Sequence, residues 1–112
     1  MDLLLNNKVA FVAASSQGLG YAVARELLQE GCHVIISGRK INNLEYAAQT
    51  LSDFGKGKIL ALAGDLSNET DCNRMIKASL DEFKTIDILI TNSGGPPSGS
   101  FDQFSLNDWE AA

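Results

Sequence analysis

The chain has 112 residues, of which 45% are hydrophobic and 21% are charged, and its formal net charge is −5 at pH 7. These values are typical of one globular domain and exclude a disordered chain. The nine Lys and Arg residues form no extended basic run, which argues against a nucleic-acid partner. The N-terminal MDLLLNN lacks the features of a signal peptide, and no apolar run has membrane-spanning length. We therefore expect a cytoplasmic protein without a membrane partner.

The cysteines give no sign of a metal centre or a disulfide framework. Cys32 and Cys72 lie in separate expected elements without paired spacing, so we expect reduced thiols. His33 is next to Cys32, but no second group of ligands accompanies this pair. We expect no metal site.

The first expected unit is a strand, a glycine turn and a helix. An apolar run from Val9 to Ala13 predicts the strand, and it ends in the small and polar segment ASSQGLG. From Tyr21 to Glu30 the apolar residues recur at helical spacing, and Gly31 is placed to end the helix. In such a unit, backbone N–H groups and a helix N-terminus face an anionic ligand.

The same alternation continues along the chain. Short apolar segments at 33–37, 58–63 and 86–91 predict three further strands. Between them we expect a helix that begins near Asn42, and another with Ser67 as its N-cap. The resulting order β-α-β-α-β-α-β predicts an α/β fold with parallel strands, right-handed crossovers and helices on both faces.

Two basic residues, Arg39 and Lys40, follow the second expected strand, and Arg39 lies 19 positions after Gly20. In dinucleotide-binding folds, a carboxylate at this point binds the ribose 2′-hydroxyl, whereas a cation accommodates a 2′-phosphate. Gly38 supplies no carboxylate. An ordinary solvated basic turn is the alternative, but the preceding glycine turn favours a phosphate site.

Three short motifs each follow an expected strand. Ala13–Gly20 aligns with the pattern T-G-x-x-x-G-x-G, Asp65–Leu66 with an Asp-Leu or Asp-Val pair, and Asn92–Gly94 with N-A-G. In this order they resemble the motifs of the short-chain dehydrogenase/reductase family, over essentially the whole chain. Ala14 replaces the first glycine of that family and Ser93 replaces its alanine. The segments ASSQGLG and NSGGPP are similar to those of the 3-oxoacyl-carrier-protein reductase-like subgroup.

The resemblance implies a Rossmann-type, doubly wound parallel sheet with strand order 3-2-1-4. Residues 1–112 would be one incomplete NAD(P)-binding domain, the N-terminal half, with NADP favoured over NAD. The implied cofactor-binding residues are Ser15, Ser16, Gln17, Gly18, Leu19 and Gly20 at the pyrophosphate, Arg39 and Lys40 at the 2′-phosphate, Asp65 and Leu66 at the adenine, and Asn92, Ser93 and Gly94 at the ribose and nicotinamide.

The family transfers hydride between nicotinamide and a carbonyl or alcohol carbon, with a serine and a Tyr-x-x-x-Lys pair as catalytic residues. Here Tyr21 is followed four positions later by Arg25, and Tyr46 by Thr50. Neither forms the catalytic pair. Arg25 cannot give up its proton as lysine does, and Tyr46 has a threonine in place of the lysine. We therefore expect no catalytic residue in this chain, and no activity of the 112-residue chain alone.

A non-catalytic function competes with the oxidoreductase, and a third interpretation is disfavoured. A truncated remnant would be a non-catalytic dinucleotide-binding or interaction module, whereas an oxidoreductase continuing past position 112 would act on a small carbonyl or acyl-thioester substrate. A flavodoxin-like or receiver-type domain is disfavoured, because the first turn lacks a run of acidic metal ligands.

The last expected strand predicts self-association. Segment 86–91 carries one charge, Asp87, and neither proline nor lysine discourages pairing of its edge. After Asn92 the run SGGPPSGS excludes regular structure, and a further helix is expected from Ser105 or Asn107. We expect a homo-oligomer, or aggregation, unless residues 96–112 cover that edge.

Overall fold

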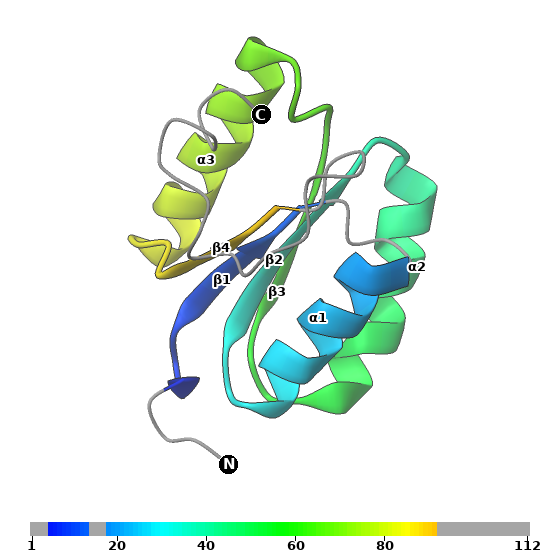
Figure 1. Ribbon diagram of the computed structural model, residues 1–112, viewed down its shortest axis with the longest axis vertical. Coiled ribbons are helices and arrows are strands. Elements are labelled where there is room, and N and C mark those ends of the chain that lie inside the picture. The colour runs from blue at the N-terminus through cyan, green and yellow to red at the C-terminus, as the bar shows by residue number, and fades with distance from the viewer. Residues whose placement is uncertain (1–4, 14–17, 92–112) are drawn as a thin grey trace.

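Four parallel strands form the centre of the protein, as Figure 1 shows. The computed structural model describes residues 5–13 and 18–91. In this part of the chain the strands lie in the order β3-β2-β1-β4, and all three neighbouring pairs are parallel. Their bounds are Val9–Val12 for β1, His33–Gly38 for β2, Ile59–Ala63 for β3 and Ile88–Ile90 for β4. The expected order 3-2-1-4 is confirmed.

Helices connect these strands and cover both faces of the sheet. α1 lies on one face together with α2, and α3 lies on the opposite face (Figure 1). α2 continues into a single 3₁₀ turn, η2, before β3. The bounds are Gly18–Gln29 for α1, Ile41–Leu51 for α2, Ser52–Phe54 for η2 and Glu69–Phe83 for α3. The structure therefore has the doubly wound arrangement that the sequence predicted.

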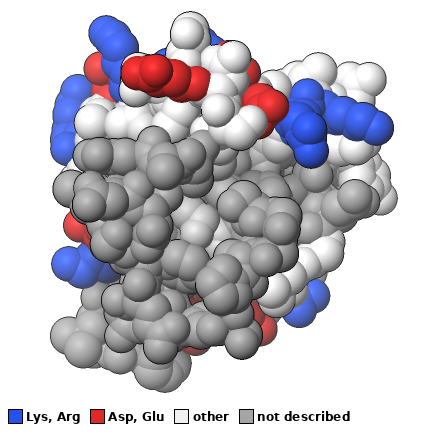
Figure 2. Space-filling view, turned by 45° about the horizontal axis from the view of Figure 1, so that its top comes forward, with Lys and Arg blue, Asp and Glu red and all other residues white. Residues whose placement is uncertain are grey.

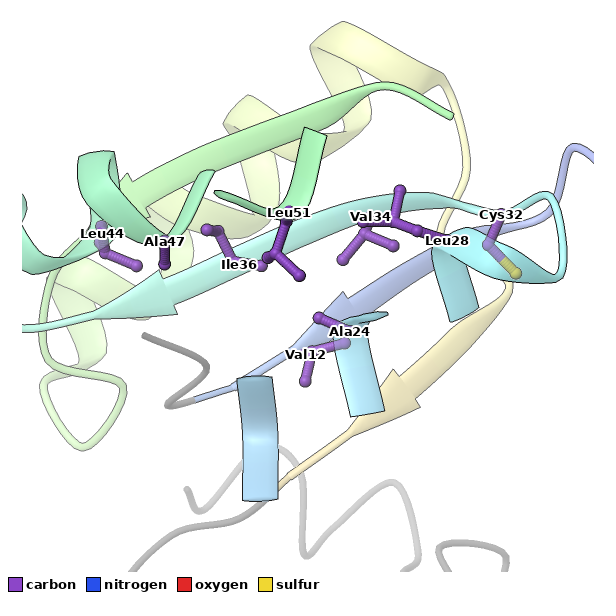
Figure 3. Close-up of a cluster of buried hydrophobic side chains, with 9 residues drawn as sticks. All are labelled: Val12, Ala24, Leu28, Cys32, Val34, Ile36, Leu44, Ala47 and Leu51. Atoms are coloured by element: carbon purple, nitrogen blue, oxygen red, sulfur yellow. The ribbon is translucent and has the colours of Figure 1, made fainter. Parts of the chain in front are cut away.

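The two cores follow from the alternation of side chains along each strand. Val12, Val34 and Ile36 point to the face of α1 and α2, where the larger cluster of Figure 3 is completed by Ala24, Leu28, Cys32, Leu44, Ala47 and Leu51. The neighbouring positions point to α3, where the buried side chains are Val9, Phe11, Ile35 and Met75. The central strands, which are mostly apolar, thus contribute side chains to two cores at once, as in other parallel sheets.

Burial falls from the middle of the sheet to its edges. All four residues of β1 are buried, whereas every residue of β3 and β4 is only half-buried. Among the described residues β4 pairs with β1 alone. Asp87 lies before β4 and binds β1 twice: its Oδ2 accepts from the Val9 N–H at 2.9 Å, and its own N–H donates to the Val9 carbonyl at 2.8 Å. These two hydrogen bonds therefore fasten the start of β4 to the start of β1.

Helix termini show where local sequence rules succeeded and failed. Gly31 follows α1 with φ +93°, as expected for a residue that tolerates the left-handed region. The expected N-cap of α3 was wrong: Asn68 caps the helix, with extended backbone and its Oδ1 2.9 Å from the Asp71 nitrogen. The Ser67 hydroxyl instead donates to Asp65 Oδ1 at 2.7 Å. The helix expected from Ser105 or Asn107 lies outside the described residues.

The described helices also bear on membrane insertion. None of them, in residues 5–13 and 18–91, is long and apolar enough to cross a membrane.

Candidate functional site

The carboxyl ends of the strands are joined by main-chain hydrogen bonds that extend beyond the strands themselves. The Ala13 N–H donates to the Ile90 carbonyl at 2.9 Å, and the Gly64 N–H donates to the Gly38 carbonyl at 2.9 Å. The loops that leave β1, β2, β3 and β4 therefore begin side by side at one edge of the sheet. In open α/β sheets this edge is where ligands bind.

The glycine turn places the start of α1 at this edge. Gly18 begins the helix with φ +67°, in the left-handed region, and no atom of the described residues lies within 4 Å of the position that a Cβ would take. A glycine is required there for its backbone conformation rather than for close packing. Gly20 is buried, and Leu19 is 68% exposed. The expected pyrophosphate residues Ser15, Ser16 and Gln17 lie outside the described residues.

The field at the start of α1 favours an anion. The first turn of α1 carries no acidic side chain, so the partial positive charge of the helix N-terminus is not compensated from within the helix. The first turn of α2, which follows Lys40, also has no acidic side chain. Two helix N-termini thus open toward the carboxyl edge of the sheet.

Two exposed basic residues follow β2. Arg39 and Lys40 are exposed, and neither side chain forms a hydrogen bond or ion pair in the described structure. Lys40 has extended backbone (φ −112°, ψ 111°) and directly precedes α2. Cations that bind no group in the described part of the chain are available to an anionic ligand.

Asp65 is fixed at the exit of β3. Its Oδ1 accepts hydrogen bonds from the Ser67 N–H at 3.0 Å and the Ser67 hydroxyl at 2.7 Å. The Ser67 hydroxyl, then the Ser67 N–H and then the charge of Arg39 lower the pKa of Asp65, and partial desolvation opposes them. Asp65 is therefore a carboxylate at neutral pH, and the Arg39 charge acts on it.

Leu66, the other residue expected at the adenine, faces the core. Its half-buried side chain packs against the cluster of Val9, Phe11, Ile35 and Met75 beneath α3. Asn92, Ser93 and Gly94, expected at the ribose and nicotinamide, lie outside the described residues.

Arg74 is a residue of this edge that sequence analysis did not identify. Its Nη2 donates to the Ala63 carbonyl at 2.7 Å and lies 3.6 Å from Asp71 Oδ1. A Cβ on Gly64 would lie 2.7 Å from the same nitrogen, so glycine leaves room for Arg74. Asp71 in turn accepts from the Asp65 N–H through Oδ2 at 2.9 Å. The i, i+3 spacing of Asp71 and Arg74 could have indicated the ion pair, but not its contact with β3.

Neither tyrosine has the surroundings of a catalytic acid. The Tyr21 hydroxyl lies 2.7 Å from Thr50 Oγ1, which donates its own proton to the Ala47 carbonyl at 3.0 Å. Tyr21 is therefore the donor, and its hydroxyl joins α1 to α2. Tyr46 is 70% exposed on α2.

Acidic and basic groups lie next to each other at this end of the molecule. Figure 2 shows the top of Figure 1 turned forward, with Lys and Arg side chains beside Asp and Glu side chains. In the described ranges, no three His, Cys, Asp or Glu side chains come together in a way that could hold a metal ion.

Comparison with known proteins identifies the family. A family model described as short chain dehydrogenase matches residues 8–112. The chain belongs to the short chain dehydrogenase family. It is 36% identical over 110 residues to human dehydrogenase/reductase SDR family member 4, covering 95% of this chain and 38% of that protein. It is 32% identical over 101 residues to 11-beta-hydroxysteroid dehydrogenase-like 2 of Arabidopsis thaliana, covering 90% of this chain and 33% of that protein.

Solved structures of short chain dehydrogenases share the fold. L-sorbose reductase of Gluconobacter frateurii, complexed with NADPH and L-sorbose, matches with a TM-score of 0.81 and 26% identity, over 99% of this chain and 42% of that one. A short chain dehydrogenase of Bacillus anthracis matches with a TM-score of 0.73 and 31% identity, over 96% of this chain and 44% of that one. The chain thus spans between a third and a half of the length of these relatives.

The hydrogen bonds to Asp65 generate a prediction. Ser67→Ala removes the largest cause of the lowered pKa, so the pKa of Asp65 should rise toward its ordinary value of 3.8. A lowered pKa stabilises the fold above the ordinary value, and this stabilisation is lost as the pH falls through the lowered pKa. From neutral pH down to the ordinary pKa of Asp65, the variant should therefore be less stable than the unmutated protein. In stronger acid the stabilities of the two proteins should converge.

An NMR titration of the Asp65 side-chain carboxyl carbon measures this change. Ser52→Ala is the matched control, because the Ser52 hydroxyl donates only to the Gln49 carbonyl within α2. An unchanged Asp65 titration in Ser67→Ala would contradict the assigned cause.

Proposed function

We propose that this chain is the cofactor-binding part of an NADP-dependent oxidoreductase that transfers hydride between nicotinamide and a carbonyl or alcohol carbon. One observation carries the proposal. Arg39 and Lys40 stand exposed and unbound to other described groups where β2 ends, at the same edge as the glycine turn of α1. Gly38 offers no carboxylate for a ribose hydroxyl. This combination suits a dinucleotide with a 2′-phosphate.

The proposed contacts follow the order of the strand ends. The α1 N-terminus would receive the pyrophosphate, because it carries no acidic residue and begins at a glycine. We assign Ser15, Ser16, Gln17, Gly18, Leu19 and Gly20 to the pyrophosphate, Arg39 and Lys40 to the 2′-phosphate, Asp65 and Leu66 to the adenine side, and Asn92, Ser93 and Gly94 to the ribose and nicotinamide. Leu66 would contribute main-chain atoms, since its side chain packs into the core.

Similar proteins support the reaction class but point to different substrates. L-sorbose reductase was solved with NADPH and a sugar, whereas another relative is named for a hydroxysteroid. We propose a small carbonyl compound or an acyl thioester as the substrate, and the motifs that resemble 3-oxoacyl-carrier-protein reductases favour the thioester.

Removing the Arg39 guanidinium tests the cofactor assignment. NADPH should bind more tightly than NADH, because a charge-assisted contact contributes about 1.5–3 kcal/mol, or roughly ten- to hundredfold in affinity. Arg39→Ala should remove most of this preference and leave NADH affinity nearly unchanged. Fluorescence titrations with both cofactors, repeated at rising salt concentration, measure the dissociation constants; the preference should shrink with salt because Arg39 is exposed.

Lys56→Ala provides the control for loss of one positive charge. Lys56 is an exposed lysine in the turn before β3, at the amino end of that strand. Lys56→Ala should leave the ratio of the NADPH and NADH affinities unchanged. Equal affinities of the unmutated protein for NADPH and NADH would refute the 2′-phosphate site.

The surroundings of the tyrosines lead to a prediction about catalysis. The 112-residue chain alone should not oxidise NADPH in the presence of ketones, aldehydes or 3-oxoacyl thioesters, because the Tyr21 hydroxyl is bound to Thr50 and Tyr46 points to solvent. Absorbance at the nicotinamide band, compared with a protein-free blank, measures the rate. Turnover that disappears in Tyr21→Phe would overturn this view and assign catalysis to Tyr21.

A non-catalytic binding module is the second candidate function. The chain covers only 33–38% of the length of two curated relatives. This coverage fits a binding module as well as it fits one part of a longer enzyme. The nucleotide sequence downstream of codon 112 distinguishes them: a catalytic serine and a Tyr-x-x-x-Lys pair in frame identify the enzyme, and a stop codon identifies the module.

We also propose that the protein associates with copies of itself. Ile88, Leu89 and Ile90 are half-buried, and one edge of β4 has no strand partner among the described residues. Such an edge offers free N–H and C=O groups for pairing. Sedimentation velocity over a concentration series should show the 112-residue chain forming dimers or larger species. A monomer at every concentration would contradict the proposal.

A further inference from the structure

The end of the sheet brings a basic and an acidic loop into register. Gly38 pairs with Ala63 across β2 and β3, and the Gly64 N–H then donates to the Gly38 carbonyl at 2.9 Å. Arg39 follows the accepting residue, and Asp65 follows the donating residue. Continued by one and two residues, this register sets Arg39 opposite Gly64 and Lys40 opposite Asp65. Arg39 and Asp65 therefore leave neighbouring strands within one residue of the same level.

Asp65 is held with one oxygen uncommitted. Ser67 occupies Oδ1 with two hydrogen bonds, while the Asp65 N–H is bound to Asp71. No hydrogen bond to Asp65 Oδ2 occurs in the described structure. The same contacts that hold the carboxylate also keep its pKa low, so it carries a full negative charge at neutral pH.

The other carboxylate of this turn has its own cation. Asp71 lies 3.6 Å from Arg74, which also donates to the Ala63 carbonyl. Arg39 has no ion-pair partner within 4 Å in the described part of the chain, yet its charge is felt by Asp65. The charges at the strand ends thus comprise one ion pair, Asp71 and Arg74, and beside it Asp65 with the neighbouring cations Arg39 and Lys40, of which Arg39 lowers the pKa of Asp65.

A fixed carboxylate beside a phosphate-binding arginine acts against the phosphate in two ways. It repels the phosphate directly, and it attracts the guanidinium that the phosphate must recruit. Both effects weaken binding of the dinucleotide that carries the 2′-phosphate, and neither affects the dinucleotide that lacks it. The effect on NADPH affinity is modest. Unit charges near a protein surface interact through a high dielectric, and salt screens them beyond about one Debye length.

We propose that Asp65 is a specificity-determining residue that limits the preference for NADP over NAD by opposing the charge of Arg39. The inference rests on the proposed 2′-phosphate site and goes beyond it, since it assigns the degree of cofactor preference to the opposite charges of Asp65 and Arg39 on neighbouring strand exits. A protein with this pair is selective for NADP without excluding NAD.

The ratio of the NADH to the NADPH dissociation constant tests the proposal, because adenine contacts are common to both cofactors and cancel. Asp65→Asn should raise this ratio about two- to fivefold at low salt, and the gain should shrink as salt screens the charges. Asp65→Glu keeps the charge and should leave the ratio near that of the unmutated protein. Glu69→Gln, which removes one negative charge from the first turn of α3, is the matched control and should leave the ratio unchanged.

Each alternative result has a separate meaning. A ratio in Asp65→Asn equal to that of the unmutated protein or of Glu69→Gln would overturn the role of Asp65 while Arg39→Ala still tests the phosphate site. An increase of the same size in Asp65→Glu would assign the effect to the lost hydrogen bonds with Ser67 and overturn the charge explanation. A ratio of one in the unmutated protein, or no binding of either cofactor, would overturn the proposed function and this inference together.

Discussion

Two main-chain hydrogen bonds beyond the ends of the strands determine where the chemistry of this protein can lie. The bond from Gly64 to Gly38 joins the exits of β3 and β2, and the bond from Ala13 to Ile90 joins those of β1 and β4. Without them the loops could diverge where the strands end. With them, the α1 N-terminus, the Arg39–Lys40 cations and the Asp65 turn occupy one edge. Every proposed contact with a dinucleotide depends on these two hydrogen bonds.

The rigid support of that edge comes from strands buried on two faces. β1 and β2 place alternate side chains into separate cores, one under α1 and α2 and one under α3. A shift of either strand by one residue would exchange the two sets of side chains, so the pattern fixes the register. The register then fixes the level at which Arg39 and Asp65 leave the sheet. The packing of the two cores consequently also determines the geometry of the candidate site.

Several polar side chains at the edge have more than one available hydrogen-bond partner, and the structure shows which partner each one binds. Ser67 could cap α3, but its hydroxyl binds Asp65, and Asn68 caps the helix. Arg74 is half exposed, and its guanidinium nevertheless binds the last carbonyl of β3 and pairs with Asp71. These choices leave Arg39 and Lys40 without partners among the described residues. Cations of this kind are more useful for binding an anion than for stabilising the fold, because surface ion pairs contribute little.

The sequence by itself determined the alternation of strands and helices, the glycine positions that end α1 and begin its turn, and, through three motifs, the family and the strand order. These features depend on local periodicity and backbone conformation, which neighbouring residues specify. Only the tertiary structure decided that Arg74 binds Ala63 and that Tyr21 binds Thr50. Such pairs join residues 11 to 29 positions apart. Their contacts require the strands to be in register, and no local pattern of residue types carries that information.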